Sequence, residues 1–155
     1  MRILVVSDTH GDLYSLQKAV MRQPTAEVVI HCGDGEEQAQ WIRDNFKDKM
    51  VISVKGNCDW GSSLNAIEEI TLEGKKILIT HGHLFNAKLT LQNLYYEAKD
   101  KKADILCFGH THIPKEIYED GIYMFNPGSC CGYNATYGYI DITPQGIVTN
   151  ILKVM

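Results

Sequence analysis

Short apolar runs alternate with stretches of helical spacing along the first third of the chain. The runs at residues 3–7, 27–31 and 50–54 are rich in Ile and Val and have the composition of buried strands. Between them, apolar residues recur at helical spacing after Asp12, which is well placed as an N-cap, and again over residues 36–46. Strands that alternate with helices in this way predict βαβ units.

The second half of the chain has a different pattern, in which strand-like runs follow one another across short glycine-containing turns. The expected strands are residues 66–72, 75–80, 105–108, 116–119, 122–125, 137–142 and 146–154. One helix, with an apolar face from Ala87 to Ala98, separates the second of these strands from the third. Early βαβ units followed by antiparallel hairpins predict an α/β (α+β) fold with two packed sheets and helices outside, in a single domain over residues 1–155.

Composition and charge narrow the classes of function. The chain has 155 residues and a formal net charge of −4, and this mildly acidic balance gives no support for a large nucleic-acid-binding surface. No apolar stretch approaches the roughly 20 residues of a membrane span. The five cysteines are an odd number without C-x-x-C spacing, so we expect reduced thiols and a cytoplasmic location.

Polar residues that can bind a metal follow the predicted strands. The densest group is Gly109-His110-Thr111-His112, in which two histidines follow an apolar run. The full set of expected ligands consists of Asp8, His10, Asp34, Asn57, His81, His110 and His112. Seven ligands exceed the four that one tetrahedral zinc takes, so we expect two metals about 3.5–4 Å apart. Asp34 is the expected bridge, because it lies between the flanking sets in the chain.

Each of these blocks has a structural alternative when it is taken alone. Asp8 can be an N-terminal cap or a loop residue, residues 33–35 can form a plain turn, and a histidine at a strand end is often a satisfied structural group. His31 lies inside a predicted strand, and we expect it to be a hydrogen-bonded core histidine. For His83 two interpretations stay open, a contact with substrate and an exposed loop position without a role.

Taken together, the blocks resemble the calcineurin-like metallophosphoesterase superfamily, and the short chain resembles its small YfcE-type phosphodiesterase branch. The resemblance is carried by Asp8-x-His10, Gly33-Asp34, Gly56-Asn57-x-Asp59, His81 and Gly109-His110-x-His112. It implies a four-layer αββα sandwich of two mixed β-sheets flanked by helices. It also implies that one metal is held by Asp8, His10, Asp34 and His112, and the other by Asp34, Asn57, His81 and His110.

The implied activity is hydrolysis of a small phosphate ester, expected to be a diester, by a hydroxide that bridges two divalent metals. We expect manganese, with zinc, iron, cobalt and nickel as alternatives that the same ligand types accept. A phosphomonoesterase and a non-catalytic protein-binding scaffold of the same fold, like a eukaryotic retromer subunit, are the alternative functions. The sequence leaves open whether the chain forms a homo-oligomer.

The expected catalytic residues are Asp34, Asn57, Cys58 and Asp59. Many members of the superfamily have histidine where this chain has Cys58. A thiol with a pKa near ~8.5 is a weak substitute at neutral pH, so we expect slow turnover of poor leaving groups. We expect Asp59 to orient a histidine ligand through its other ring nitrogen, and the backbone of residues 126–129 to line the floor of the pocket.

Overall fold

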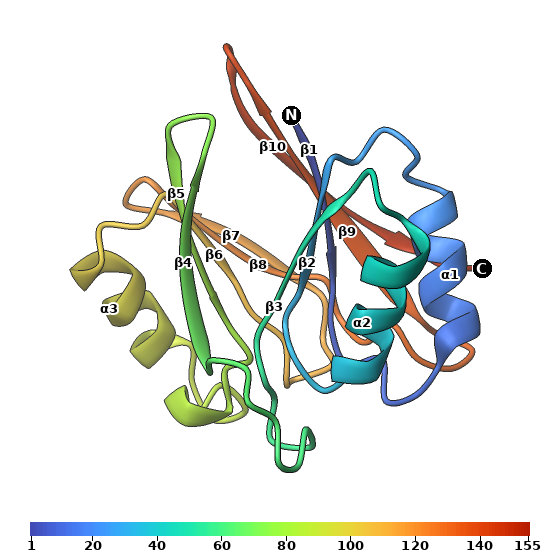
Figure 1. Cartoon of the computed structure of the whole chain (residues 1–155). Helices are drawn as coiled ribbons and strands as arrows, with labels where there is room; N and C mark the ends of the chain where they lie inside the picture. Colours follow the sequence, from blue (N-terminus) through green and yellow to red (C-terminus); the bar gives the residue numbers. More distant parts are fainter.

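The computed structural model describes residues 1–155, which form two five-stranded sheets and three α-helices (Figure 1). The first sheet has the order β10-β9-β1-β2-β3, with strands β1 (Arg2–Val6), β2 (Val28–His31), β3 (Met50–Ser53), β9 (Thr136–Thr143) and β10 (Gly146–Lys153). The second has the order β4-β5-β6-β8-β7, with strands β4 (Ile67–Leu72), β5 (Lys75–Thr80), β6 (Ile105–Cys107), β7 (Lys115–Glu119) and β8 (Ile122–Asn126). The helices are α1 (Leu13–Met21), α2 (Glu36–Asn45) and α3 (Gln92–Asp100), and a 3-10 segment spans His83–Phe85.

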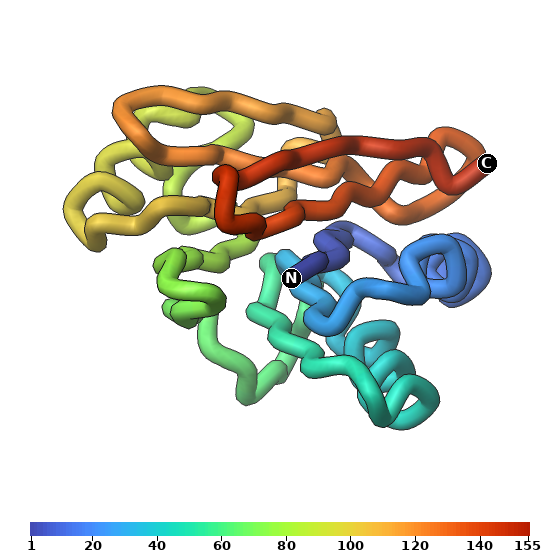
Figure 2. The backbone as a smooth tube through the Cα atoms, turned by 90° about the horizontal axis from the view of Figure 1, so that it is seen from above, coloured from blue at the N-terminus to red at the C-terminus, as the bar shows by residue number.

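Both sheets are mixed, with parallel strands grouped together in each. Strands β1, β2 and β3 are parallel, and β9 and β10 extend that sheet antiparallel. Strands β5, β6 and β8 are likewise parallel, and β4 and β7 form its antiparallel edges. Figure 2 shows the final hairpin returning beside the first strand, which agrees with the pairing of β9 with β1.

Alternation along the central strands explains the layers. In β1, Leu4 and Val6 pack toward the helices of the first sheet, in a cluster that includes Leu16 of α1. Ile3 and Val5 face the other way, into a core cluster that also draws residues from the second sheet. Helix α3 covers the outer face of that second sheet. Figure 1 shows α1 and α2 on one side of the paired sheets and α3 on the other, so the expected αββα sandwich is confirmed.

Most predicted elements are present, and one boundary is corrected. The helix with the apolar face was expected to include Ala87, but it begins at Gln92. Asn86 has φ +53°, a left-handed conformation that ends the preceding 3-10 turn. Ala87 therefore lies in a loop, although its side chain is buried. The predicted N-cap is confirmed, because the Asp12 carboxylate accepts the Ser15 N–H at 3.0 Å. None of the helices combines the length and the apolar character needed to span a membrane.

Candidate metal centre

The loops that carry the predicted ligands meet at one edge of the sandwich. Three of them follow the parallel strands β1, β2 and β3 of the first sheet, and two follow β5 and β6 of the second. Because parallel strands end on the same side, each sheet collects its loops there. In Figure 1 these strand ends lie at the lower side of the molecule.

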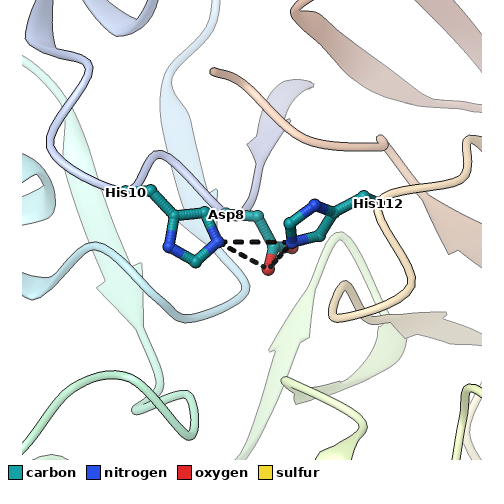
Figure 3. A group of neighbouring side chains, drawn as sticks. All are labelled: Asp8, His10 and His112. Carbon is teal, nitrogen blue, oxygen red and sulfur yellow. Dashed lines mark hydrogen bonds and ion pairs between the residues drawn. The ribbon is translucent and has the colours of Figure 1, made fainter. Parts of the chain in front are cut away.

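One part of the cluster consists of Asp8, His10 and His112, which come from opposite sheets. Figure 3 shows both imidazoles directed at the same carboxylate. Asp8 Oδ1 lies 3.1 Å from His112 Nε2 and 3.7 Å from His10 Nε2. The two Nε2 atoms are 3.2 Å apart. Three potential ligand atoms therefore converge on one small volume, although the histidines lie about a hundred positions apart in the chain.

Asp34 joins this group to a second one. Its Oδ2 lies 3.2 Å from His81 Nε2 and 3.8 Å from His10 Nε2. Asn57 Oδ1 is 3.1 Å from the same His81 nitrogen. The structure thus places Asp34 between His10 on one side and the His81–Asn57 pair on the other.

His110 is positioned differently from the other predicted ligands. Its ring lies 5.0 Å from the ring of His81, centroid to centroid, but its nitrogens do not pair with either carboxylate of the cluster. Its backbone N–H donates to Asp8 Oδ2 at 3.0 Å. His110 therefore borders the site and helps to hold Asp8.

The donor set fits divalent cations. Asp8 Oδ1 is buried and accepts no hydrogen bond, although His112 Nε2 lies 3.1 Å away. Oδ2 of the same group accepts from Ser7 Oγ at 2.6 Å and from the His110 N–H. A buried carboxylate oxygen without a partner costs several kcal/mol. A cation bound among the neighbouring imidazoles would remove that cost, and carboxylate oxygens with imidazole nitrogens are ligands that such ions accept.

Backbone strain is concentrated in the same loops. Five predicted ligands have left-handed φ angles, namely Asp8 (+53°), His10 (+42°), Asp34 (+58°), His110 (+68°) and His112 (+61°). Each such conformation costs of order 1–3 kcal/mol and persists only where the surroundings impose it. The first loops are held by hydrogen bonds from the Asp8 N–H to Gly33 O and from the His10 N–H to Asp34 O. The fold therefore stores strain where it directs side chains into the cluster.

Hydrogen bonding fixes the ring of His81. The imidazole is fully buried, and Nδ1 lies 2.7 Å from Cys32 O. Because a carbonyl can only accept, Nδ1 carries the proton and Nε2 faces the carboxylates. Burial lowers the pKa of His81, but the hydrogen bond to Asp34 and the charge of Asp8 outweigh it, so that the pKa is raised. For the Asp34 carboxyl, burial alone would raise the pKa. The hydrogen bonds that it accepts from His81 and Cys58 outweigh burial and hold the pKa well below its usual range.

The role expected for Asp59 is wrong. Its carboxylate contacts no histidine and instead accepts four backbone N–H groups: Oδ1 from Gly35 and Glu36, and Oδ2 from Asp34 and Gly56. Two of these donors belong to the start of α2, where anionic side chains are favoured. Asp59 therefore ties the loop after β3 to the loop that carries Asp34.

His31 supports the site from behind, and its prediction as a core histidine is confirmed. Its ring is 1% exposed, and burial lowers its pKa to about 4. Nδ1 accepts the Gly33 N–H at 3.2 Å, so the neutral ring carries its proton on Nε2, 3.0 Å from Thr9 Oγ1. Gly35 packs against this pair so closely that a Cβ would overlap the Thr9 hydroxyl.

Three polar side chains brace the ligand loops in ways that sequence patterns did not indicate. Ser7 bonds to Asp8, and Ser129 Oγ donates to the Asp8 carbonyl at 2.8 Å. Asn126 Nδ2 donates to Gly109 O at 3.2 Å and lies 3.0 Å from Thr111 Oγ1. That the backbone of residues 126–129 lines the floor of the pocket stays a prediction, and two of its side chains, Asn126 and Ser129, supply bracing contacts. The only sequence signal for the contacts of Asn126 and Ser129 was the position of this segment at the end of β8, a third parallel strand of the second sheet.

Cys58 and His83 lie at the border of the cluster. Cys58 is exposed, and its Sγ belongs to a group of potential ligand atoms with His10 and Asp34 that lie within 4.8 Å of one another. Partial desolvation of the sulfur beside the ligand loops and the negative charge of Asp34 raise the pKa of Cys58, so the thiol keeps its proton at neutral pH. The ring of His83 lies 5.4 Å from that of His81, and its Nδ1 is buried without a partner.

Several curated proteins are similar in sequence to this chain. The probable metallophosphoesterase YsnB of Bacillus subtilis is 40% identical to this chain over 130 residues, which cover 83% of this chain and 75% of YsnB. The phosphodiesterase YfcE of Escherichia coli is 30% identical in an alignment 173 positions long, gaps included, that covers 91% of this chain and 88% of YfcE. The resemblance to the YfcE-type branch is thereby confirmed.

Solved structures show the same fold. The crystal structure of a predicted phosphoesterase from Streptococcus pneumoniae matches with a TM-score of 0.83 at 28% identity, covering 99% of this chain and 89% of that one. Vps29 from Entamoeba histolytica, in a complex with Zn²⁺, matches with a TM-score of 0.74 at 21% identity over the whole of both chains, a likeness of fold alone. The sequence profile of the calcineurin-like phosphoesterase superfamily domain matches residues 1–144, and the chain therefore belongs to this superfamily.

Proposed function

We propose that this protein is a dinuclear metal-dependent phosphoesterase that prefers phosphodiesters. The observation that carries the proposal is the convergence of carboxylates and imidazoles from both sheets around the unpartnered Asp8 Oδ1. The names of its relatives support phosphoester hydrolysis, and YfcE is named a phosphodiesterase. The core that joins both sheets supports a single domain over residues 1–155. The cytoplasmic location stays a prediction.

The ligand residues divide into two sets that share Asp34. Asp8, His10 and His112 would hold one ion, and Asn57, His81 and His110 the other. Asp34 Oδ1 accepts the Cys58 N–H at 2.8 Å, so Oδ2 is the oxygen that faces both sets. Divalent ions, when bound, supply Lewis-acid stabilisation of the phosphoryl group and activation of the attacking water; manganese is our first choice, with zinc, iron, cobalt and nickel as alternatives.

The remaining residues position the substrate and hold protons. Asn57 is a neutral ligand, which leaves the cluster less negative than an all-carboxylate one and favours an anionic ester. The Cys58 thiol is protonated and lies beside Asp34, so it is placed to give a proton to a leaving oxygen. A thiol is a weak acid for this task, and slow hydrolysis of poor leaving groups follows.

The proposal predicts manganese-dependent hydrolysis of bis(p-nitrophenyl) phosphate. We expect turnover to require added manganese, to exceed that of p-nitrophenyl phosphate, and to be abolished in Asp34→Ala. The matched control is Asp48→Ala, which removes an aspartate whose side chain is 75% exposed and should leave turnover unchanged. Turnover that survives chelation and Asp34→Ala would contradict the proposal.

A protein-binding scaffold is the second candidate, supported by the fold shared with Vps29. The two functions differ in what they require of the cluster, because a scaffold needs neither metal nor turnover. Absence of both manganese uptake and hydrolysis of the diester or the monoester would favour the scaffold. A higher rate with p-nitrophenyl phosphate than with the diester would favour a phosphomonoesterase.

A further inference from the structure

A cleft of about 820 Å³ opens from the cluster beside His10, Asp34 and Cys58. It continues over the first turns of α2 and along the loop between β3 and β4, which projects below the sheets in Figure 1. Its lining is largely polar, with Trp60 and Leu64 among its few apolar residues. Because the cleft and the ligands share a wall, a substrate held at the cluster can extend one ester arm into it.

Trp60 is the feature of this cleft that packing does not explain. It is 91% exposed, and it lies two positions after Cys58, at the edge of the ligand cluster. The other tryptophan, Trp41 of α2, is partly buried against the core, and its ring lies 5.7 Å from that of Phe46, centroid to centroid. A large aromatic surface left open beside a reaction centre is suited to contact with an apolar, planar partner.

The loop that carries Trp60 is held at both ends. The Asp59 carboxylate joins its first part to the backbone around Asp34. The Ser62 N–H donates to Asp59 O, and the Lys55 N–H donates to Asn65 O across the base of the loop. The backbone of Trp60 is thus fixed relative to a predicted metal ligand, and such preorganisation reduces the entropic cost of binding.

The charges of the cleft restrict the arm that it accepts. Glu36 and Glu37 line it, and the only lining cation, Arg43, directs its guanidinium to Val51 O at 3.3 Å and Ser53 Oγ at 2.8 Å. An arm that bears further negative charge is therefore disfavoured, whereas hydroxyl and amino groups find acceptors.

We propose that Trp60 determines specificity by stacking on an uncharged aromatic ring of the substrate, as in a phosphodiester with a nucleoside arm. This inference rests on the proposed function, because the phosphate of that ester lies at the cluster. The ribose hydroxyls would face the polar lining of the cleft and the base would lie on the indole.

Calorimetric titration of the manganese-loaded protein tests the inference with two ligands that share a phosphate and differ in the ring, adenosine 5′-monophosphate and ribose 5-phosphate. Base–aromatic stacking is worth about 1–3 kcal/mol, so we expect the adenosine ligand to bind about 5- to 150-fold more tightly. Trp60→Ala should bring its affinity to that of ribose 5-phosphate, and Trp60→Phe should retain most of the difference. Tyr96→Ala, which removes an aromatic residue 60% exposed on α3, should change neither affinity.

Equal affinities of the wild-type protein for the two ligands, or an equal loss of both in Trp60→Ala, would overturn the stacking. If the wild-type protein then still hydrolyses bis(p-nitrophenyl) phosphate, the proposed function stands without this inference. If neither ligand binds and no ester is hydrolysed, both are wrong.

Discussion

The loops of the first sheet supply both carboxylates of the cluster, whereas the loops of the second sheet supply only imidazoles. Asp8 and Asp34 follow β1 and β2, and His81 and His112 follow β5 and β6. The two contributions meet at Asp8 Oδ1, which lies 3.1 Å from His112 Nε2 and 3.7 Å from His81 Nε2. The negative charge thus comes from one sheet and much of the neutral donor set from the other, so neither half forms the site alone.

The two sheets also brace their loops differently. In the loops of the first sheet, the Asp59 carboxylate accepts four backbone N–H groups, and His31 is hydrogen-bonded to Thr9. Behind the second, Asn126 bonds to the carbonyl of Gly109 and to the Thr111 side chain. A carboxylate and a neutral buried histidine therefore brace the loops of the first sheet, whereas the bracing side chain contributed by the second sheet, Asn126, is a neutral amide. Substitutions on the first sheet should have the larger effects.

The largest effect is expected for Asp8→Asn, which keeps the shape of the side chain and removes the charge at the meeting point. Loss of a metal-binding carboxylate should lower kcat by at least about 1,000-fold, or about 4 kcal/mol, and weaken manganese binding. Steady-state hydrolysis of bis(p-nitrophenyl) phosphate and manganese titration measure the two changes. Activity within tenfold of the wild-type value would show that the carboxylate of Asp8 is not a ligand.

A smaller but substantial effect is expected for Asp59→Asn. Each carboxylate oxygen accepts two N–H groups, so an amide nitrogen in either position faces donors and cannot bond to them. We expect a loss of about 2–3 kcal/mol in the free energy of unfolding and a manganese affinity about 10- to 100-fold weaker.

The matched control on the second sheet is Asp104→Asn. The Asp104 carboxylate accepts a single backbone N–H, from Lys76, and an asparagine can keep that bond by presenting its oxygen. Urea denaturation should show a loss below about 1 kcal/mol. Similar losses for the two variants would contradict the bracing role assigned to Asp59.

The contribution of His31 to the bracing of the first sheet should make the stability of the protein depend on pH. Burial lowers the pKa of His31 to about 4 in the folded protein, whereas an unfolded histidine titrates near ~6.5. The unfolded state therefore binds more protons between these values. The contribution of His31 is complete above about pH 6.5 and is lost as the pH falls toward 4.

Urea denaturation of the metal-free protein at pH 7 and pH 5 measures this contribution. Between these pH values, wild-type protein should lose about 2 kcal/mol more of its free energy of unfolding than His31→Gln does. The variant is the control for the other histidines, which titrate in both proteins. Equal losses in the two proteins would show that His31 is not held neutral in the fold.

The sequence predicted the layers and the ligand loops because both depend on local patterns. Runs such as Ile3–Val6 identify strands buried on two faces, and glycine with polar residues at strand ends identifies loops that can hold ligands. The contacts of Asp59 could not be predicted, because three of its four partners are backbone groups of a loop more than twenty residues away. The exposure of Trp60 and the bracing by Asn126 depend on the approach of separate loops, on which local patterns carry no information.

Anomalous diffraction from a crystal soaked in manganese tests the central claim most directly, because it locates each ion independently of activity. We predict two peaks about 3.5–4 Å apart, one beside Asp8, His10 and His112, the other beside Asn57, His81 and His110, and both within ligand distance of Asp34. A structure with no peak at these loops, or with peaks outside the cluster, would contradict the account of two sheets that together hold a pair of ions.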